Sequence, residues 1–321
     1  MNPRTAPHVL LIGLGALVGA CVAQPEGPSE MVTIPRGATL ATVIDSLQAR
    51  GIIVKPRFFR FYARVTGQAR RIQAGTYSLP SRSTVRRVLA VLVAGRPAEV
   101  RLVVPEGLWL EEVASVVERQ LGIPAESLMV AARDSMLIAH VGAPAATLEG
   151  YLYPSTYLVR RDARAGDVVR QMVEEFERQW RPEWNARLDS LGFARHQLVT
   201  LASIIEGEVR DPRDRRYVSS VYHNRLKRGM RLQADPTVAY GLHARRRLFE
   251  RDLFVRSPYN TYAIDGLPPG PIGAPSAASM EAALYPAKTD FLYFVARVDG
   301  LHVFSRTYAE HLDAIRDIRS P

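Results

Sequence analysis

Residues 34–43 read Ile-Pro-Arg-Gly-Ala-Thr-Leu-Ala-Thr-Val, and residues 104–113 repeat the pattern as Val-Pro-Glu-Gly-Leu-Trp-Leu-Glu-Glu-Val. In each copy a short strand leads into a Pro-x-Gly turn. Apolar residues three and four positions apart then predict an amphipathic helix. Gly51 and Gly122 stand where these helices are expected to end. The folded part of the chain therefore starts with two copies of a strand–turn–helix unit.

The segment between the two copies completes a small subdomain. Residues 57–65 and 83–92 are predicted to be helices, and residues 72–78 a strand. A strand–helix–helix–strand unit of this size loosely resembles a LysM module, a small peptidoglycan-binding fold. The alternative is a unit that only positions the next domain, and the sequence does not decide between binding and spacing.

The N-terminus predicts export from the cytoplasm. Arg4 precedes an uncharged apolar run over residues 9–23, as in a secretory signal. Fifteen residues are fewer than the roughly 20 that usually span a bilayer, although a short anchor is possible where flanking side chains snorkel. The run Val18-Gly19-Ala20-Cys21 resembles a bacterial lipobox, in which Cys21 would carry lipid. Either interpretation tethers the chain to a membrane, and a lone cysteine excludes an intramolecular disulfide.

The rest of the chain predicts helices and mostly antiparallel strands, which is α+β architecture. Helices are expected over residues 165–180, 195–209 and 217–228. Strands over 290–298 and 301–305 flank Asp299-Gly300, a strong hairpin signal, and Thr307 with Glu310 form a capping box for a last helix. The predicted organisation is an anchor and linker over 1–30, a LysM-like subdomain over 31–100 and a catalytic domain over 101–321.

Composition narrows the function only broadly. The 321 residues carry a formal charge of +10, which fits nucleic acid, acidic lipid or an acidic polymer as partner. An apolar content of 47% excludes a wholly disordered chain. Export and the lack of a recognition motif argue against nucleic acid. The seven histidines show no metal-site spacing, so neither a metal nor another cofactor is expected.

The sequence Leu-Ala-Ser-Ile-Ile-Glu-Gly-Glu over residues 201–208 carries the strongest chemical signal. On a helix Glu206 shares the apolar face of Val199 and Ala202, whereas Glu208 points about 200° away and is expected to reach solvent. Burial raises a carboxyl pKa, as a general acid near neutral pH requires. The alternative is a helix-end glutamate that pairs with one of the many arginines.

Downstream loops add residues suited to sugar. Asp235 is expected to cap a helix that has Pro236 at its first position. Residues 257–262 and 266–272 are constrained loops rich in Asn, Thr, Tyr, Gly and Pro. Polar and aromatic side chains of these types bind sugar hydroxyls through hydrogen bonds and sugar faces through stacking.

Five sequence blocks in order make the chain resemble the YceG-like family of endolytic murein transglycosylases (the MltG type): LEGYLYPSTY, LASIIEGE, HNRLKRGMRLQADPTVAYG, YNTYAIDGLPPGPI and DFLYFVA, over residues 148–296. The resemblance implies a single spanning helix at the N-terminus and assigns catalysis to Glu206. Gly207 departs from the larger polar residue expected there. Substrate contacts are expected from residues of the matched blocks: Gln233, Asp235, Thr237, Tyr240, Asn260 and Tyr262. For Asp235 the cap alone is an equal alternative.

The resemblance implies cleavage of the β-1,4 bond between N-acetylmuramic acid and N-acetylglucosamine in peptidoglycan glycan strands. One glutamate would protonate the leaving oxygen and then deprotonate the muramyl 6-hydroxyl, which closes a 1,6-anhydro ring. Such an enzyme would limit the length of nascent glycan strands. It would be attached to the bacterial cytoplasmic membrane, with its catalytic domain on the periplasmic (extracytoplasmic) side and with cell-wall synthases as possible partners. Two rivals remain: a hydrolytic muramidase with Glu208 or Asp235 as second carboxylate, and a noncatalytic murein-binding scaffold.

Overall fold

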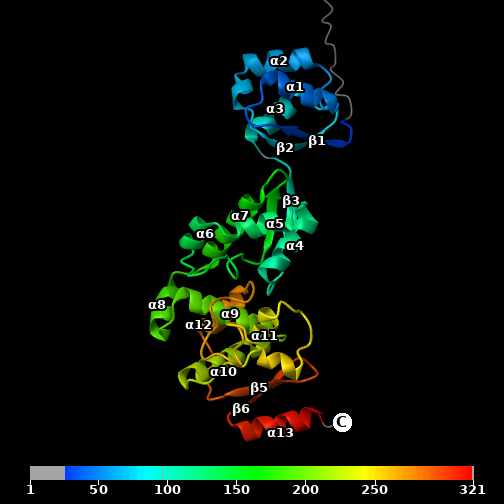
Figure 1. Cartoon of the computed structure of the whole chain (residues 1–321). Helices are drawn as coiled ribbons and strands as arrows, with labels where there is room; N and C mark the ends of the chain where they lie inside the picture. Colours follow the sequence, from blue (N-terminus) through cyan, green and yellow to red (C-terminus); the bar gives the residue numbers. More distant parts are fainter. Residues whose placement is uncertain (1–25, 96, 320–321) are drawn as a thin grey trace, which may run out of the picture. The chain divides into compact units, whose positions relative to one another are not determined.

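The computed structural model describes residues 26–95 and 97–319 (Figure 1). The chain divides between Ala98 and Glu99 into two compact units, each with its own hydrophobic core. Within the described ranges no helix is both long and apolar enough to cross a bilayer. The predicted anchor and Cys21 fall on residues 1–25, outside the described part of the chain.

The first unit follows the predicted order of strand, two helices and strand. Strand β1 pairs antiparallel with β2 and places Val32 opposite Tyr77. Phe59, Leu47 and Leu89 lie in the core beneath this ribbon, all completely buried. The elements are β1 (Ser29–Ile34), α1 (Leu40–Ala49), α2 (Pro56–Val65), the 3₁₀ turn η1 (Gln68–Arg71), β2 (Gly75–Pro80) and α3 (Val85–Ala94).

The second unit is a helical assembly with two short antiparallel ribbons, so the α+β prediction is confirmed. Its elements are β3 (Glu99–Val103), α4 (Leu110–Leu121), α5 (Ala125–Ala131), α6 (Ser135–His140), β4 (Thr156–Arg160), α7 (Ala165–Gln179), α8 (Glu183–Leu191), α9 (Arg195–Glu208), η2 (Pro212–Asp214), α10 (Arg215–Lys227), α11 (Asp235–Gly241), η3 (Glu250–Phe254), α12 (Ala277–Leu284), β5 (Tyr293–Ala296), β6 (His302–Ser305) and α13 (Tyr308–Arg319). Strand β3 pairs with β4, and β5 pairs with β6.

Helix α9 is the centre of this unit. Residues 198–205 are all buried, because α8, α10, α11 and α12 pack around it. A helix that is covered on all sides shows weak amphipathicity, since its apolar residues need not lie on one stripe. The two carboxylates at its C-terminal end, Glu206 and Glu208, are thereby placed inside the unit.

The two copies of the repeat differ at their helix caps. Thr39 caps α1 with its hydroxyl, which accepts from the amide of Thr42 at 3.2 Å. In the second copy Trp109 stands at the corresponding position and cannot cap in this way. Glu112 instead accepts from the amide of Trp109 at 2.8 Å.

The predicted C-terminal hairpin and helix are present, but both strands are shorter than expected, and the five residues 297–301 connect them instead of Asp299-Gly300 alone. Strands β5 and β6 flank Asp299-Gly300, and Gly300 takes a positive φ of 86°. The capping box is present, because the Glu310 amide donates to the Thr307 hydroxyl at 3.2 Å and the Thr307 amide donates back to the Glu310 carboxylate. The sequence missed shorter elements such as α6 and β4, which are too brief for their periodicity to be recognised.

Candidate active site

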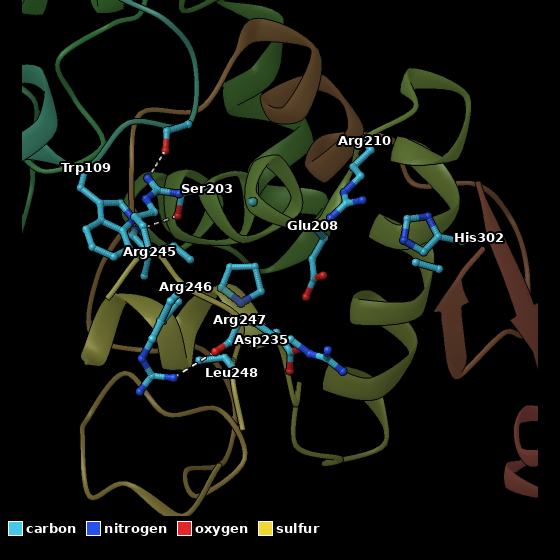
Figure 2. Close-up of a pocket in the computed structure, with 16 residues that line it drawn as sticks. Trp109, Ser203, Glu208, Arg210, Asp235, Arg245, Arg246, Arg247, Leu248 and His302 are labelled. Carbon is cyan, nitrogen blue, oxygen red and sulfur yellow. Dashed lines mark hydrogen bonds between the residues drawn. The ribbon is translucent and has the colours of Figure 1, made fainter. Parts of the chain in front are cut away.

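A cavity of about 840 Å³ lies at the C-terminal end of α9. Its walls come from the turn between β3 and α4, the end of α9, the start of α11, the loop after α11 and the hairpin β5–β6. Figure 2 shows Trp109 and Arg245 on one flank, Arg210 and His302 on the other, and Glu208 and Asp235 between them. The cavity therefore joins segments that are far apart in the sequence.

Glu208 is the carboxyl that α9 delivers into this cavity. The hydroxyl of Tyr222, from α10, donates to Glu208 Oε1 at 2.8 Å. Burial raises the pKa of Glu208 from 4.5 to about 7, and the negative charge of Asp235 adds to this shift while the Tyr222 hydrogen bond opposes it. Glu208 is partly exposed, so the expectation that it can reach solvent is met through the cavity, although α10 and α11 pack against α9 beside it.

Glu206 is held differently. Its Oε2 accepts from the backbone amide of Ser276 at 3.0 Å and also from the Ser276 hydroxyl, while Arg215 Nη2 lies 3.4 Å from Oε1. The side chain is only 8% exposed and is not among the residues that line the cavity. Burial, followed by the nearby charge of Glu206, raises the pKa of Glu106. Glu206 thus belongs to a buried polar cluster behind the cavity wall.

Asp235 lines both this cavity and a neighbouring one of about 420 Å³, which Gln233 and Tyr262 also line. The Tyr262 hydroxyl donates to Asp235 Oδ1 at 2.7 Å. The helix cap predicted for Asp235 is wrong: Ala234 precedes the first helical residue, and α11 begins at Asp235 itself without a side-chain cap. The carboxylate is instead turned toward Tyr262. Among the predicted contact residues, the structure brings Gln233, Asp235 and Tyr262 to cavity walls.

The other predicted contacts lie behind these walls. Thr237 and Asn260 have no exposed surface. Asn260 Nδ2 donates to the carbonyls of Leu253 and Val255 at 2.9 and 2.8 Å, which fixes the loop around it. Thr237 donates to the carbonyl of Ala234 at 2.7 Å within the first turn of α11.

Tyr240 also points away from the cavity. Its hydroxyl donates to Glu149 Oε2 at 3.1 Å, and its ring meets Trp109 edge-to-face at 5.5 Å between centroids. Burial raises the pKa of Glu149 to about 7. Tyr240 therefore supports the ring of Trp109 from behind.

Two residues on α10 brace the site. Asn224 Nδ2 donates to the carbonyls of Thr289 and Phe291, each at 2.9 Å. Arg225 donates through Nε to the carbonyl of Leu292 at 2.7 Å and through Nη1 to that of Leu232 at 2.8 Å. These bonds connect α10 with the segment before β5 and with the segment that leads to Gln233. Asn224 and Arg225 therefore hold the backbone around the cavity rather than line its main wall.

A model of the YceG-like family matches residues 32–317. The chain belongs to the YceG-like family. A relative in Bacillus subtilis, an endolytic murein transglycosylase, is 32% identical over 94% of this chain and 89% of the relative. An endolytic murein transglycosylase of Streptococcus pneumoniae is 28% identical, and the match covers 88% of this chain and 58% of that protein. A crystal structure of a yceG-like protein from Listeria monocytogenes superposes with a TM-score of 0.62 at 32% identity, over 90% of this chain and 99% of that one.

Gly207 has a structural explanation in this member of the YceG-like family. A Cβ atom at position 207 would lie 2.8 Å from Cβ and 3.0 Å from Cγ of Pro236. The absence of a side chain lets the first turn of α11 approach the last turn of α9. Helix α9 continues through Gly207 to Glu208 rather than ending at the glycine. The departure from the larger residue expected there brings Asp235 close to Glu208.

Several wall residues were missed by the sequence interpretation. The guanidinium of Arg245 lies 4.2 Å from the ring centroid of Trp109 and pairs with Glu112 at 2.6 Å. Arg246, Arg247, Arg210 and His302 complete the basic lining. The run of three arginines at 245–247 is visible in the sequence, and so is Trp109 as the residue that differs between the two repeats. Nothing local to Arg210 or His302 predicts that they meet at this cavity.

Proposed function

We propose that the chain is an endolytic murein transglycosylase that cleaves peptidoglycan glycan strands. The names of its relatives in Bacillus subtilis and Streptococcus pneumoniae support the reaction class. The observation that carries the proposal is Glu208, a carboxyl with a pKa raised to about 7 that lines a cavity of about 840 Å³. A cavity of this volume accommodates sugar rings, and the basic lining suits a polymer with anionic peptides.

The general acid is assigned to Glu208 in place of Glu206, the residue favoured from the sequence. A general acid must be within reach of the atom it protonates, and Glu208 lines the cavity whereas Glu206 does not. Ser276 and Arg215 already satisfy the oxygens of Glu206. We assign Glu206 a positioning role, because it connects the end of α9 to Ser276 at the start of α12.

The reaction follows from one carboxyl. Protonated Glu208 donates to the glycosidic oxygen as the bond to the muramyl anomeric carbon breaks. The resulting carboxylate then takes the proton of the muramyl 6-hydroxyl, whose oxygen bonds to the anomeric carbon and closes the 1,6-anhydro ring. The acceptor belongs to the substrate, so proximity replaces a second catalytic carboxylate. Glu208 finishes the cycle protonated, as it began.

The remaining wall residues have binding or positioning roles in this proposal. Trp109 is only 7% exposed and Arg245 lies over its ring, so this pair forms a rigid part of the cavity wall and shapes the space for a sugar ring. Gln233 and Tyr262 are the polar contacts that face a cavity. Thr237, Tyr240 and Asn260 position the loops rather than touch substrate, because their polar atoms are already paired within the protein.

A matched pair of variants tests the assignment. Glu208→Gln keeps the size of the side chain and the hydrogen bond with Tyr222 but removes the proton donor, so anhydromuramyl products from purified murein should fall about 10²–10⁴-fold. Glu206→Gln, two residues away on the same helix, should retain most of the activity and lose stability instead. Mass spectrometry of the digests measures the products, and circular dichroism checks the fold. Full activity of folded Glu208→Gln would overturn the proposal.

A hydrolytic muramidase is the second candidate, and Asp235 favours it. Asp235 lines the same cavity as Glu208, and its charge acts on that carboxyl. A hydrolase uses a second carboxylate to activate water or attack the sugar. Digestion in heavy-oxygen water separates the two reactions: a muramidase incorporates the label at the new reducing end, and a transglycosylase produces unlabelled anhydro ends.

Membrane attachment, the role of the first unit and the cellular setting form part of the same proposal. We infer a tether to the cytoplasmic membrane through residues 1–30, either by a helix or by a lipid on Cys21, with both units on the extracytoplasmic side. The first unit would act as a LysM-like module, and cleavage near cell-wall synthases would limit the length of nascent strands. The mass of the mature N-terminal peptide distinguishes a lipidated Cys21 from an intact Met1.

A further inference from the structure

Helix α2 of the first unit carries an apolar stripe on its outer surface. Phe58 is 52% exposed, Phe61 63% and Val65 69%, and Val54 just before the helix is 62% exposed. Four large apolar side chains within twelve residues are an unusual concentration for a water-facing surface. Exposed apolar residues that occur singly need no explanation, but a continuous stripe indicates a binding surface.

The stripe is separate from the face of α2 that builds the core. At about 100° per residue, Phe58, Phe61 and Val65 fall within an arc of about 60°. Phe59 and Ala63 face the opposite way and are completely buried in the core of the first unit. The helix therefore has two apolar faces, and only one of them is used for folding.

Basic side chains border the outer stripe. Lys55, Arg57, Arg60 and Arg64 are all exposed, and the three arginines lie on one flank of α2, between the stripe and the face that packs into the core. The segment 46–98 contains eleven basic residues and no Asp or Glu. The surface around the stripe is therefore strongly positive.

The formal charge of the whole chain resides in its first part. Residues 1–98 carry thirteen basic and three acidic side chains, which accounts for the full +10. Residues 99–321, which hold the candidate active site, carry 29 of each sign. A general attraction to anionic wall polymer gives no reason for the positive charge to gather in residues 1–98. A basic surface that binds the membrane beside the predicted tether would explain why the charge lies there.

We propose that the outer face of α2 binds the surface of a bilayer rich in anionic phospholipid. An apolar stripe bordered by Arg and Lys is the pattern of a helix that lies in the membrane interface, with aromatic rings below the headgroups and cations among the phosphates. The predicted membrane segment ends near residue 23, so at most about 20 Å of chain separates it from Ser29 at the start of β1. This contact would give the first unit a second attachment to the membrane. The inference does not depend on the proposed catalytic activity.

Vesicle binding tests the proposal with a chain that starts at Glu26. Both cores consist of residues after position 31, so this chain keeps them. It should cosediment with vesicles of phosphatidylglycerol and phosphatidylcholine, bind weakly to phosphatidylcholine alone and dissociate as salt rises. Replacing Phe58 and Phe61 together with Ser should weaken binding at least about tenfold, and changing Arg57, Arg60 and Arg64 to Gln should weaken it on the order of a hundredfold.

Val130→Ser is the matched control, since Val130 is 64% exposed but lies on α5 of the second unit. This variant should bind vesicles like the parent. Equal binding to charged and uncharged vesicles, or equal loss in the control, would overturn the proposal. So would a concentration-dependent dimer in ultracentrifugation that the Phe58 and Phe61 substitutions abolish, because a second copy would then be the occupant of the stripe.

The full chain provides an independent readout. Phe61→Trp, in chain reconstituted into vesicles with brominated phosphatidylglycerol, should show a blue-shifted emission and quenching beyond that of the three native tryptophans. Val130→Trp should add an unquenched signal. An unquenched Trp at position 61 would show that residues 1–25 or another part of the protein covers the stripe, and the proposal would fail.

Discussion

Glu149 is a second carboxyl of this unit with a pKa raised to about 7, and burial is the main cause. It accepts from the amide of Leu110 at 3.1 Å and from the hydroxyl of Tyr240 at 3.1 Å. Glu208 shares this pKa but lines a cavity, whereas Glu149 is not among the residues that line it. Our proposal therefore gives two carboxyls with the same shift different roles, because only Glu208 lines the cavity. A raised pKa identifies a catalytic candidate only together with access.

Glu149 predicts a pH dependence of stability. Its pKa is about 7 in the folded chain and near 4.5 when exposed, so the folded state binds the proton more tightly. Protonated Glu149 therefore contributes to the free energy of unfolding. The full contribution is present below about pH 4.5, and about 3 kcal/mol of it is lost as the pH rises to about 7. The raised pKa of Glu208 changes the free energy of unfolding with pH in the same direction.

Glu149→Gln should therefore lose less stability than the wild type between about pH 5 and about pH 8. Urea unfolding followed by circular dichroism at the two pH values measures the difference. Identical pH dependence in the two proteins would show that the buried carboxyl does not titrate in this range.

At the scale of elements, the site depends on how closely α9 and α11 approach. Helix α9 ends at Glu208, and α11 starts at Asp235 with Pro236 against Gly207. Arg225 keeps this arrangement in place by holding the carbonyl of Leu232, just before α11. The two carboxyls that matter most are thus positioned by helix ends, and a shift of either helix would separate them.

Gly207→Ala should disturb this approach. The added Cβ would meet the Pro236 ring at 2.8 Å, and a rigid ring cannot turn aside, so we expect a loss of about 1–3 kcal/mol and reduced activity. Gly166→Ala on α7 is the control, since no atom lies within 4 Å of its added Cβ, and it should be neutral or stabilising by about 0.5 kcal/mol. Thermal unfolding and product formation measure both effects. A stabilised, fully active Gly207→Ala would contradict the close approach.

At the scale of the molecule, the two units differ in charge and in core. The core of the second unit is built from residues 102–284, and that of the first from residues 32–92. The first unit carries the basic surface and the outer face of α2, while the second carries the cavity and no net formal charge. Attachment and chemistry are therefore assigned to different units.

A chain that starts at Glu99 should fold by itself, because its core receives no side chain from residues 1–98. We expect a cooperative thermal transition, cleavage of murein in solution, and vesicle binding reduced on the order of a hundredfold or more. Calorimetry, product analysis and cosedimentation measure these properties. A fragment without a cooperative transition would show that the second unit needs the first in order to fold.

The sequence by itself determined the order of the longer helices and strands, the repeat, the C-terminal hairpin and the family, because these depend on local periodicity, turn residues and contiguous motifs. It predicted that residues 201–208 carry the chemistry and assigned the general acid to Glu206, whereas our proposal assigns that role to Glu208. Periodicity assumes one buried face, and α9 is covered on all sides, so only the tertiary structure decided which carboxyl meets the cavity. Only the tertiary structure likewise shows that Arg210, His302 and Trp109, which come from distant segments, line the same cavity. Burial and access depend on neighbours that the chain brings together only on folding.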